Sequence, residues 1–160
     1  RAAVKELAPN HLYLGCRFPY QVNALVTEAA RKSCDVMSFN WYYYDATGFE
    51  APGGLDLPMI IGEFHFGALD RGLFHPGLKR TDDQTARATA YQRFVRSALS
   101  HPNIVGTTWF KYSDEPCTGR WLDTENYQIG FLDVCDNPYR ETVSTAREVG
   151  RNLYRLRSGD

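Results

Sequence analysis

Pro58-Met59-Ile60-Ile61-Gly62-Glu63-Phe64 is the stretch of sequence that decides the fold. Its apolar residues run on without alternating with polar ones until Glu63, which is typical of a strand that is covered on both faces. Similar short apolar runs alternate with helical patterns along the rest of the chain. Strands that alternate with helices favour a parallel sheet with helices packed over it. The sequence therefore predicts an α/β fold.

The expected elements follow one another as strand, helix, strand, loop, strand, helix, strand and helix. The strands are expected at 11–16, 34–40, 58–64 and 104–110, and the helices at 22–32, from 81 to just before 101, and from 138 onward. Thr81 and Gln84 form a capping box at the start of the second helix. A short extended piece is expected at 129–134. Two architectures fit this order, an open doubly wound sheet of flavodoxin size and part of a (β/α)8 barrel.

The chain is too short to form a whole (β/α)8 barrel, so the barrel interpretation requires that it be part of one. A whole (β/α)8 barrel needs about 250 residues and eight strand–helix units. This sequence has 160 residues, which is room for about half of the units. The chain is therefore expected to be one domain or a piece of a larger one.

The composition excludes several kinds of partner. Lys and Arg number 18 against 19 Asp and Glu, so no basic excess indicates binding to nucleic acid or to an anionic membrane. No apolar run approaches the roughly 18 residues of a membrane span. The four cysteines and four histidines lack the paired spacing of a zinc site, so no metal is expected. Glycine-rich phosphate-binding motifs are absent from the sequence as well.

The residues that end the predicted strands are a mixture of charged, amide and aromatic side chains. Ligands bind at the carboxyl ends of the strands in either architecture. Sugars present apolar C–H faces to aromatic rings and hydroxyls to polar groups, so this mixture suits a carbohydrate. The candidate binding residues are Arg17, Asn40, Trp41, Tyr43, His65, Trp109 and Lys111, around the candidate carboxylate Glu63.

Glu63 is the residue of greatest interest. Alternation along the strand places it on one face with Met59 and Ile61. A carboxylate in that position needs partners, because an unpaired buried charge is costly. The candidate partners are Arg17, Tyr43 and His65, and the alternative is a purely structural ion pair with Arg17 or Arg71.

Other residues keep two interpretations. Trp109 is either a core residue or the wall of a cleft, and the polar sequence after it favours the cleft. Four acidic residues are interpreted as solvated loop charges rather than catalytic groups: Asp70, Asp114, Glu115 and Asp133.

The stretch Pro58–Gly67 resembles the seventh strand of clan A glycoside hydrolases. The longer stretch Gly62–Gly72 is similar to glycoside hydrolase family 50, the β-agarases, and so is Asn126–Asp133. The β-galactosidases of the same clan are close competitors. The resemblance covers essentially the whole chain, and it implies that residues 1–160 are the C-terminal half, strands five to eight, of a (β/α)8 TIM barrel.

The resemblance also implies roles for single residues. Glu63 matches the catalytic nucleophile of a retaining mechanism, and Tyr43 falls near the tyrosine that hydrogen-bonds it. Trp109 matches the aromatic platform under the sugar, and Asn40 and His65 fall in the same subsite. The substrate is expected to be a galactose-containing polysaccharide, no cofactor is required, and a secreted or periplasmic location is implied.

One departure from the clan's pattern limits this expectation. The clan's general acid/base is a glutamate that follows an asparagine, and the sequence contains no Asn-Glu pair. A retaining glycosidase needs two carboxyl groups about 5–5.5 Å apart. The chain is therefore expected to be inactive alone and to need the missing N-terminal half as a partner. Two rivals stay open: a sugar-binding α/β domain without catalysis, and a complete flavodoxin-like domain.

Overall fold

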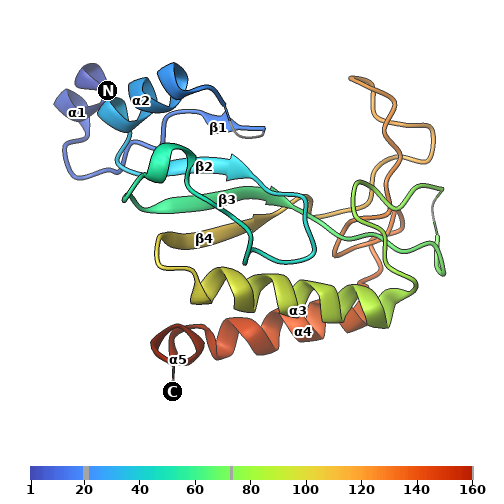
Figure 1. Cartoon of the computed structure of the whole chain (residues 1–160). Coiled ribbons are helices and arrows are strands. Elements are labelled where there is room, and N and C mark those ends of the chain that lie inside the picture. Colours follow the sequence, from blue (N-terminus) through green and yellow to red (C-terminus); the bar gives the residue numbers. More distant parts are fainter. Residues whose placement is uncertain (20–21, 73, 160) are drawn as a thin grey trace.

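A four-stranded parallel sheet forms the centre of the protein (Figure 1). The computed structural model describes residues 1–19, 22–72 and 74–159. The strands are β1 (Arg17–Phe18), β2 (Met37–Asn40), β3 (Met59–Phe64) and β4 (Ile104–Trp109), and they lie in the order β1-β2-β3-β4. The α/β fold with a parallel sheet is confirmed. A doubly wound sheet reverses its strand order at a switch point, so the sequential order argues against the flavodoxin-like alternative.

Helices flank the sheet at both of its edges. They are α1 (Ala2–Leu7), α2 (Ala24–Ser33), α3 (Gln84–Ser100), α4 (Arg140–Arg151) and α5 (Leu153–Ser158), with a short 3-10 turn η1 (Pro52–Gly54). Helices α3 and α4 lie side by side next to β4, and α1 and α2 lie at the β1 end (Figure 1). The long loops after β3 and β4 gather at the carboxyl ends of the strands, which is where ligands bind in sheets of this kind.

The core lies between the sheet and α3. The Phe64 ring at the end of β3 stacks on Phe94 of α3, with the ring centres 4.0 Å apart. Phe94, Val95 and Ala98 are buried together in this cluster, as the helical spacing of apolar residues predicts. Burial of such side chains contributes roughly 1.5–3 kcal/mol each, so this contact fixes α3 against the strand that carries Glu63.

The first strand lies later in the sequence than expected. Residues 11–16 are not a strand, and pairing with β2 begins only at Arg17. Two features explain the difference. Gly15 has a φ of 64°, which turns the chain out of the extended conformation. Tyr13 exchanges hydrogen bonds with Asp35, through its N–H to the Asp35 carboxylate and through its carbonyl to the Asp35 N–H.

Helix α3 begins with a different cap from the predicted one. The Asp83 side chain accepts a hydrogen bond from the Ala86 N–H at 2.7 Å, so Asp83 is the N-cap. Thr81, the predicted cap, donates its hydroxyl to the Gly67 carbonyl instead. The expected extended piece at 129–134 forms single bridges at Leu132 and no strand, and α4 starts at Arg140, after Pro138 rather than with it.

Two further findings concern partners and ligands. No helix within the described ranges is long and apolar enough to span a membrane. The described residues contain no group of three or more His, Cys, Asp or Glu side chains arranged to hold a metal ion, and the four cysteines are free thiols.

Candidate active site

Glu63 lies buried near the end of β3, with only 9% of its surface exposed. The pairing of β3 is irregular on both sides, with register shifts between Phe39 and Asn40 on β2 and between Ile61 and Phe64 on β3. Such irregularities interrupt the alternation of faces along a strand. Ile61 accordingly belongs to the apolar core, whereas the Glu63 carboxylate meets polar groups. The expectation that these side chains share a face is therefore wrong.

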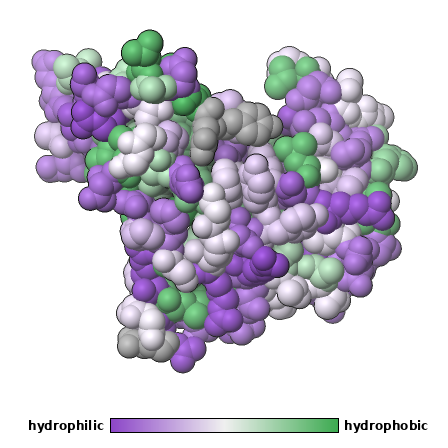
Figure 2. Space-filling view, in the orientation of Figure 1, coloured by the Kyte–Doolittle hydropathy of each residue, from purple (hydrophilic) through white to green (hydrophobic). Residues whose placement is uncertain are grey.

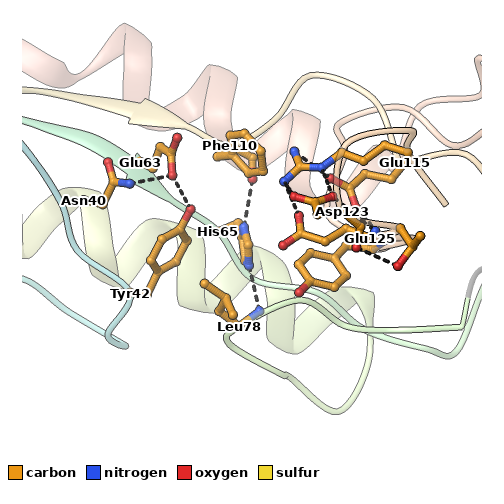
Figure 3. A network of polar contacts seen from close by, with 12 residues as sticks. Asn40, Tyr42, Glu63, His65, Leu78, Phe110, Glu115, Asp123 and Glu125 are labelled. Atoms are coloured by element: carbon orange, nitrogen blue, oxygen red, sulfur yellow. Dashed lines mark hydrogen bonds and ion pairs between the residues drawn. The ribbon is translucent and has the colours of Figure 1, made fainter. Parts of the chain in front are cut away.

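Three side chains bind the Glu63 carboxylate, and Figure 3 shows two of them, Asn40 and Tyr42. The Asn40 Nδ2 and the Tyr42 hydroxyl each donate to Oε2 at 2.7 Å. The Arg17 guanidinium pairs with Oε1, with Nη2 at 2.6 Å. Hydrogen bonds to an ionised acceptor are shorter and stronger than neutral ones, so this arrangement both balances the charge and fixes the carboxylate's orientation.

A glycine allows the arginine to reach this carboxylate. A Cβ at Gly62 would overlap the aliphatic part of the Arg17 side chain and the Ser38 hydroxyl. The bare backbone at this position therefore leaves the space through which Arg17 passes from β1 across the sheet to Glu63. The ion pair between Arg17 and Glu63 therefore depends on the glycine at position 62.

The tyrosine that contacts Glu63 is Tyr42 and not Tyr43, which corrects the expected hydrogen bond. Burial, followed by the hydrogen bond to Glu63, raises the pKa of Tyr42, so its hydroxyl keeps its proton and remains a donor. Tyr43 is 56% exposed. Its ring stacks on Trp41 at 4.2 Å between centres and lies below the Lys79 ammonium. The adjacent residues Tyr42 and Tyr43 therefore point in different directions: the Tyr42 hydroxyl binds Glu63, whereas the Tyr43 ring packs on Trp41.

His65 supports the site without binding Glu63. Its Nε2 accepts a hydrogen bond from the Leu78 N–H at 2.8 Å, so the proton must sit on Nδ1, which donates to the Phe110 carbonyl at 3.1 Å (Figure 3). Burial lowers its pKa to about 3. The neutral ring contacts Tyr42, with centres 4.8 Å apart, and it links the loops that follow β3 and β4.

Trp109 lies on the helix side of the sheet. Its ring packs edge-on against Phe64 and Tyr91, and its Nε1 donates to the Ile129 carbonyl at 2.8 Å. These contacts agree with the core interpretation and do not support the expected platform under a sugar. The next residue, Phe110, lines the cavity beside Glu63 instead.

A cavity of about 370 Å³ opens beside the Glu63 carboxylate. Four of the eight predicted site residues line it, and they are Arg17, Asn40, Glu63 and His65, joined by Tyr42. The other predicted residues lie outside its described wall: Trp41, Tyr43, Trp109 and Lys111. The strand ends therefore supply one side of the site, as expected from a parallel sheet.

The loop after β4 supplies the opposite side. Its lining residues are Phe110, Arg120, Leu122, Glu125 and Tyr127. Arg120 pairs with Asp123 at 2.5 Å, with Glu125 at 2.6 Å and with Glu115 at 3.4 Å. Burial and the nearby charges of Glu115 and Asp123 raise the pKa of Glu125. No periodic pattern marks these residues in the sequence, and the density of charges around Arg120 is the one signal that points to them.

Two acidic residues of this loop are buried rather than solvated. Glu115 is fully buried, and its Oε2 accepts from the Tyr127 N–H at 2.9 Å. Asp114 accepts from the Tyr139 hydroxyl at 2.6 Å and from the Gly130 N–H at 2.7 Å. The interpretation of these two as solvated loop charges is therefore wrong, since both hold the loop in place.

A buried arginine fastens the same loop to α3. Arg87 is fully buried and donates to the Phe66 carbonyl at 2.8 Å and to the Gly130 carbonyl at 2.6 Å. Burial lowers its pKa to about 10. The end of β3, helix α3 and the loop after β4 are thereby joined through one guanidinium, which sets the shape of the cavity wall.

The fold of this chain is similar to one part of a larger solved enzyme. A family 2 β-galacturonidase from Eisenbergiella tayi matches it with a TM-score of 0.58 over 92% of this chain and 29% of that chain. The two sequences are 16% identical, so this likeness concerns the fold alone. No family model matches the sequence.

Several β-agarases are much more similar to this chain in sequence. Beta-agarase B of Vibrio sp. (strain JT0107) is 42% identical over 161 residues, which cover 98% of this chain and 17% of that protein. Beta-agarase A of the same strain is 42% identical, over 95% of this chain and 16% of its own length. The structure of an exo-β-agarase matches with a TM-score of 0.90 and 44% identity, over 99% of this chain and 22% of the other.

A second agarase structure, AgWH50C, has a TM-score of 0.91 and 42% identity over 98% of this chain and 25% of that one. The chain is therefore related along essentially its whole length to the family 50 β-agarases. It spans about a sixth of the length of the curated relatives it matches.

Proposed function

We propose that this chain is part of the catalytic domain of a retaining β-agarase and that Glu63 is its nucleophile. The observation that carries the proposal is the Glu63 carboxylate itself. It lies at the carboxyl end of a central parallel strand, beside a cavity and bound by three side chains. The relationship to β-agarases supplies the reaction class, and the substrate is a galactose-containing polysaccharide.

The four strands are strands five to eight of a (β/α)8 barrel in this proposal, and residues 1–160 are one partial catalytic domain. The sequential, wholly parallel order of β1 to β4 supports it, because a barrel is built from such neighbours. The open edges of β1 and β4 are then the places where the other strands pair. The polypeptide acts on an external polymer, so secretion or export to the periplasm belongs to the same proposal.

The mechanism is a double displacement. Glu63 attacks the anomeric carbon of the sugar and forms a glycosyl-enzyme ester, which water then hydrolyses. Tyr42 and Asn40 donate to one carboxylate oxygen and Arg17 pairs with the other, so the nucleophile is oriented before the substrate arrives. No step requires a metal or an organic cofactor.

The second carboxyl group of the mechanism lies outside residues 1–160. A retaining enzyme needs an acid/base about 5–5.5 Å from the nucleophile. Glu125 is the other carboxylate on the described wall of the cavity, and it is paired with Arg120. The sequence contains no glutamate that follows an asparagine, as the clan's acid/base does, so we assign this group to an N-terminal half of the barrel, without which residues 1–160 lack turnover.

Kinetics of a Glu63 variant test the proposal. We expect the complete natural polypeptide that carries residues 1–160 to hydrolyse agaro-oligosaccharides. Glu63→Gln keeps the size of the side chain and should lower kcat at least about 10³-fold, because removal of a nucleophile typically costs that much or more. Glu148→Gln, at an exposed position on α4, is the matched control. Mass spectrometry after reaction with an activated 2-fluoro-galactoside should find the label on Glu63.

Four results would contradict parts of the proposal. Undiminished activity of Glu63→Gln would exclude its role as nucleophile. Turnover by residues 1–160 alone, lost in Glu63→Ala, would show that the acid/base lies within this chain. Binding of agaro-oligosaccharides without any turnover by the complete polypeptide would favour a carbohydrate-binding domain, and preference for aryl β-galactosides would favour a β-galactosidase.

A further inference from the structure

The tip of the loop after β4 exposes a tryptophan that packing does not explain. Trp121 is 93% exposed, and its neighbour Leu122 is 66% exposed. Leu122 and Arg120, on either side of it, both line the Glu63 cavity. Figure 2 shows the region of this loop as a lobe that projects beside a hollow in the surface, at the upper right of the view. The exposed ring therefore stands at the rim of the candidate active site.

This tip, residues 116–125, is held in a defined shape, and we refer to it as the Arg120 loop. The Arg120 N–H donates to the Glu125 carbonyl at 2.8 Å, and the Thr124 N–H donates to the Arg120 carbonyl at 2.9 Å. The Gly119 backbone has a φ of 83°, and a Cβ there would approach the Thr124 carbonyl oxygen to 2.6 Å. The loop therefore closes tightly around Arg120.

The Arg120 side chain adds an ionic clasp to this backbone. It pairs with Asp123 and Glu125 within the loop and with buried Glu115 at its base. The guanidinium also lies over the Phe110 ring, 5.6 Å from its centre. A binding surface that is already ordered loses little conformational entropy when a ligand arrives, so the loop has the property that a recognition element needs.

The two sides of the loop differ in chemistry. Arg120 and Glu125 face the cavity, where a guanidinium donates and a carboxylate accepts hydrogen bonds. Trp121 presents an apolar ring to solvent outside it. Sugars need both kinds of surface, because their hydroxyls require polar partners and the C–H faces of their rings lie on aromatic rings. A polymer that leaves the cavity on the side of this loop crosses this rim.

We propose that the Arg120 loop binds the sugar units next to the one that Glu63 attacks. Arg120 and Glu125 hydrogen-bond the hydroxyls of a unit inside the cavity, and Trp121 stacks on the ring of a unit further along the chain. This inference rests on the proposed function. According to this inference, a preference of the enzyme for polymeric over short substrates would come from residues 116–125, which lie far in the sequence from Glu63.

Tryptophan fluorescence gives a direct test. Trp41 and Trp109 are half-buried, so Trp121 is the most exposed tryptophan of residues 1–160. The difference between the wild type and Trp121→Phe isolates the share of the acrylamide-quenched emission that belongs to Trp121. In the Glu63→Gln background of the complete polypeptide, which binds without turnover, we expect an agaro-hexasaccharide to protect this emission. An agaro-disaccharide should protect it much less.

Kinetics with the active polypeptide provide the second measurement. Trp121→Ala should raise KM for the hexasaccharide about tenfold while kcat changes little, because a buried aromatic contact at a binding surface contributes about that much affinity. The KM for an aryl β-galactoside should stay the same. Tyr154→Ala is the matched control, since Tyr154 is an equally exposed aromatic residue, 86% accessible, on α5 at the far end of the fold.

The outcomes separate this inference from the proposed function. Hexasaccharide binding with unchanged acrylamide quenching, together with an unchanged KM in Trp121→Ala, would overturn the role of the loop and leave the proposed function standing. An unchanged KM with an altered elution volume would assign Trp121 to a protein contact and overturn it too. Absence of both binding and turnover in the wild type would end the proposed function and the inference together.

Discussion

At the scale of single residues, two adjacent tyrosines have different roles in this site. Tyr42 reaches Glu63 while Tyr43 stacks on Trp41 in solvent. Identical side chains one position apart along the loop after β2 thus have unrelated surroundings. The pair offers an internal comparison, since the same substitution can be made at both positions.

Tyr42→Phe should lower kcat/KM about 10- to 100-fold in the complete polypeptide. It removes one hydrogen bond to a charged group, a contact that contributes about 1.5–3 kcal/mol. Tyr43→Phe removes the same atom from an exposed ring and should leave kcat/KM within about twofold. Steady-state kinetics on agaro-oligosaccharides provide the measurement, and equal losses in both variants would disprove the distinction.

The strand-end residues of the site were predictable from the sequence, and the loop residues were not. Asn40 ends β2, Glu63 and His65 lie at the end of β3, and Arg17 belongs to the two-residue strand β1. The carboxyl ends of parallel strands meet at one edge of a sheet. Register shifts and loop conformation decide which way the next side chains point, and these depend on contacts between distant segments. Such contacts determine that Tyr42 and not Tyr43 binds Glu63, and that Glu125 lies on the cavity wall.

At the scale of elements, α3 is the helix that connects the core to the site. Its apolar face packs on β3, and its buried Arg87 holds the loop after β4. The apolar face was predictable because helical spacing alone defines it. The capping residue was not, because Thr81 and Asp83 both suit an N-cap and only the tertiary contact of Thr81 with Gly67 separates them.

Asp83→Ala should destabilise the protein by about 0.5–2 kcal/mol, the usual effect of removing an N-cap side chain. Asp82→Ala removes the same charge from an exposed neighbour and should change stability by less than about 0.5 kcal/mol. Urea unfolding of residues 1–160, followed by circular dichroism, measures both. A larger effect of Asp82→Ala would place the cap elsewhere.

At the scale of the whole molecule, the two long loops and the sheet depend on a neutral His65. Its ring bonds the loops that follow β3 and β4, and burial lowers its pKa to about 3. The unfolded chain has a histidine pKa of about 6.5, so it takes up a proton in the range where the folded protein does not. The stabilisation is present above about pH 6.5 and is lost as the pH falls toward 3.

The free energy of unfolding should therefore fall with decreasing pH below 6.5, with His65 contributing up to about 1.4 kcal/mol per pH unit. His65→Gln, which cannot titrate, should flatten this dependence. The exposed His11 provides the control, and His11→Gln should keep the wild-type slope. Urea titrations at several pH values between 4 and 7 measure the slopes, and identical slopes in all three proteins would refute the assignment to His65.

The sequential order of β1 to β4 has a consequence for how the protein is made. Each strand pairs with the next one along the chain, so a nascent polypeptide leaving the ribosome can add each strand to an edge that already exists. No pairing among these four strands waits for a distant segment, which keeps the loop-closure entropy of each of these steps small.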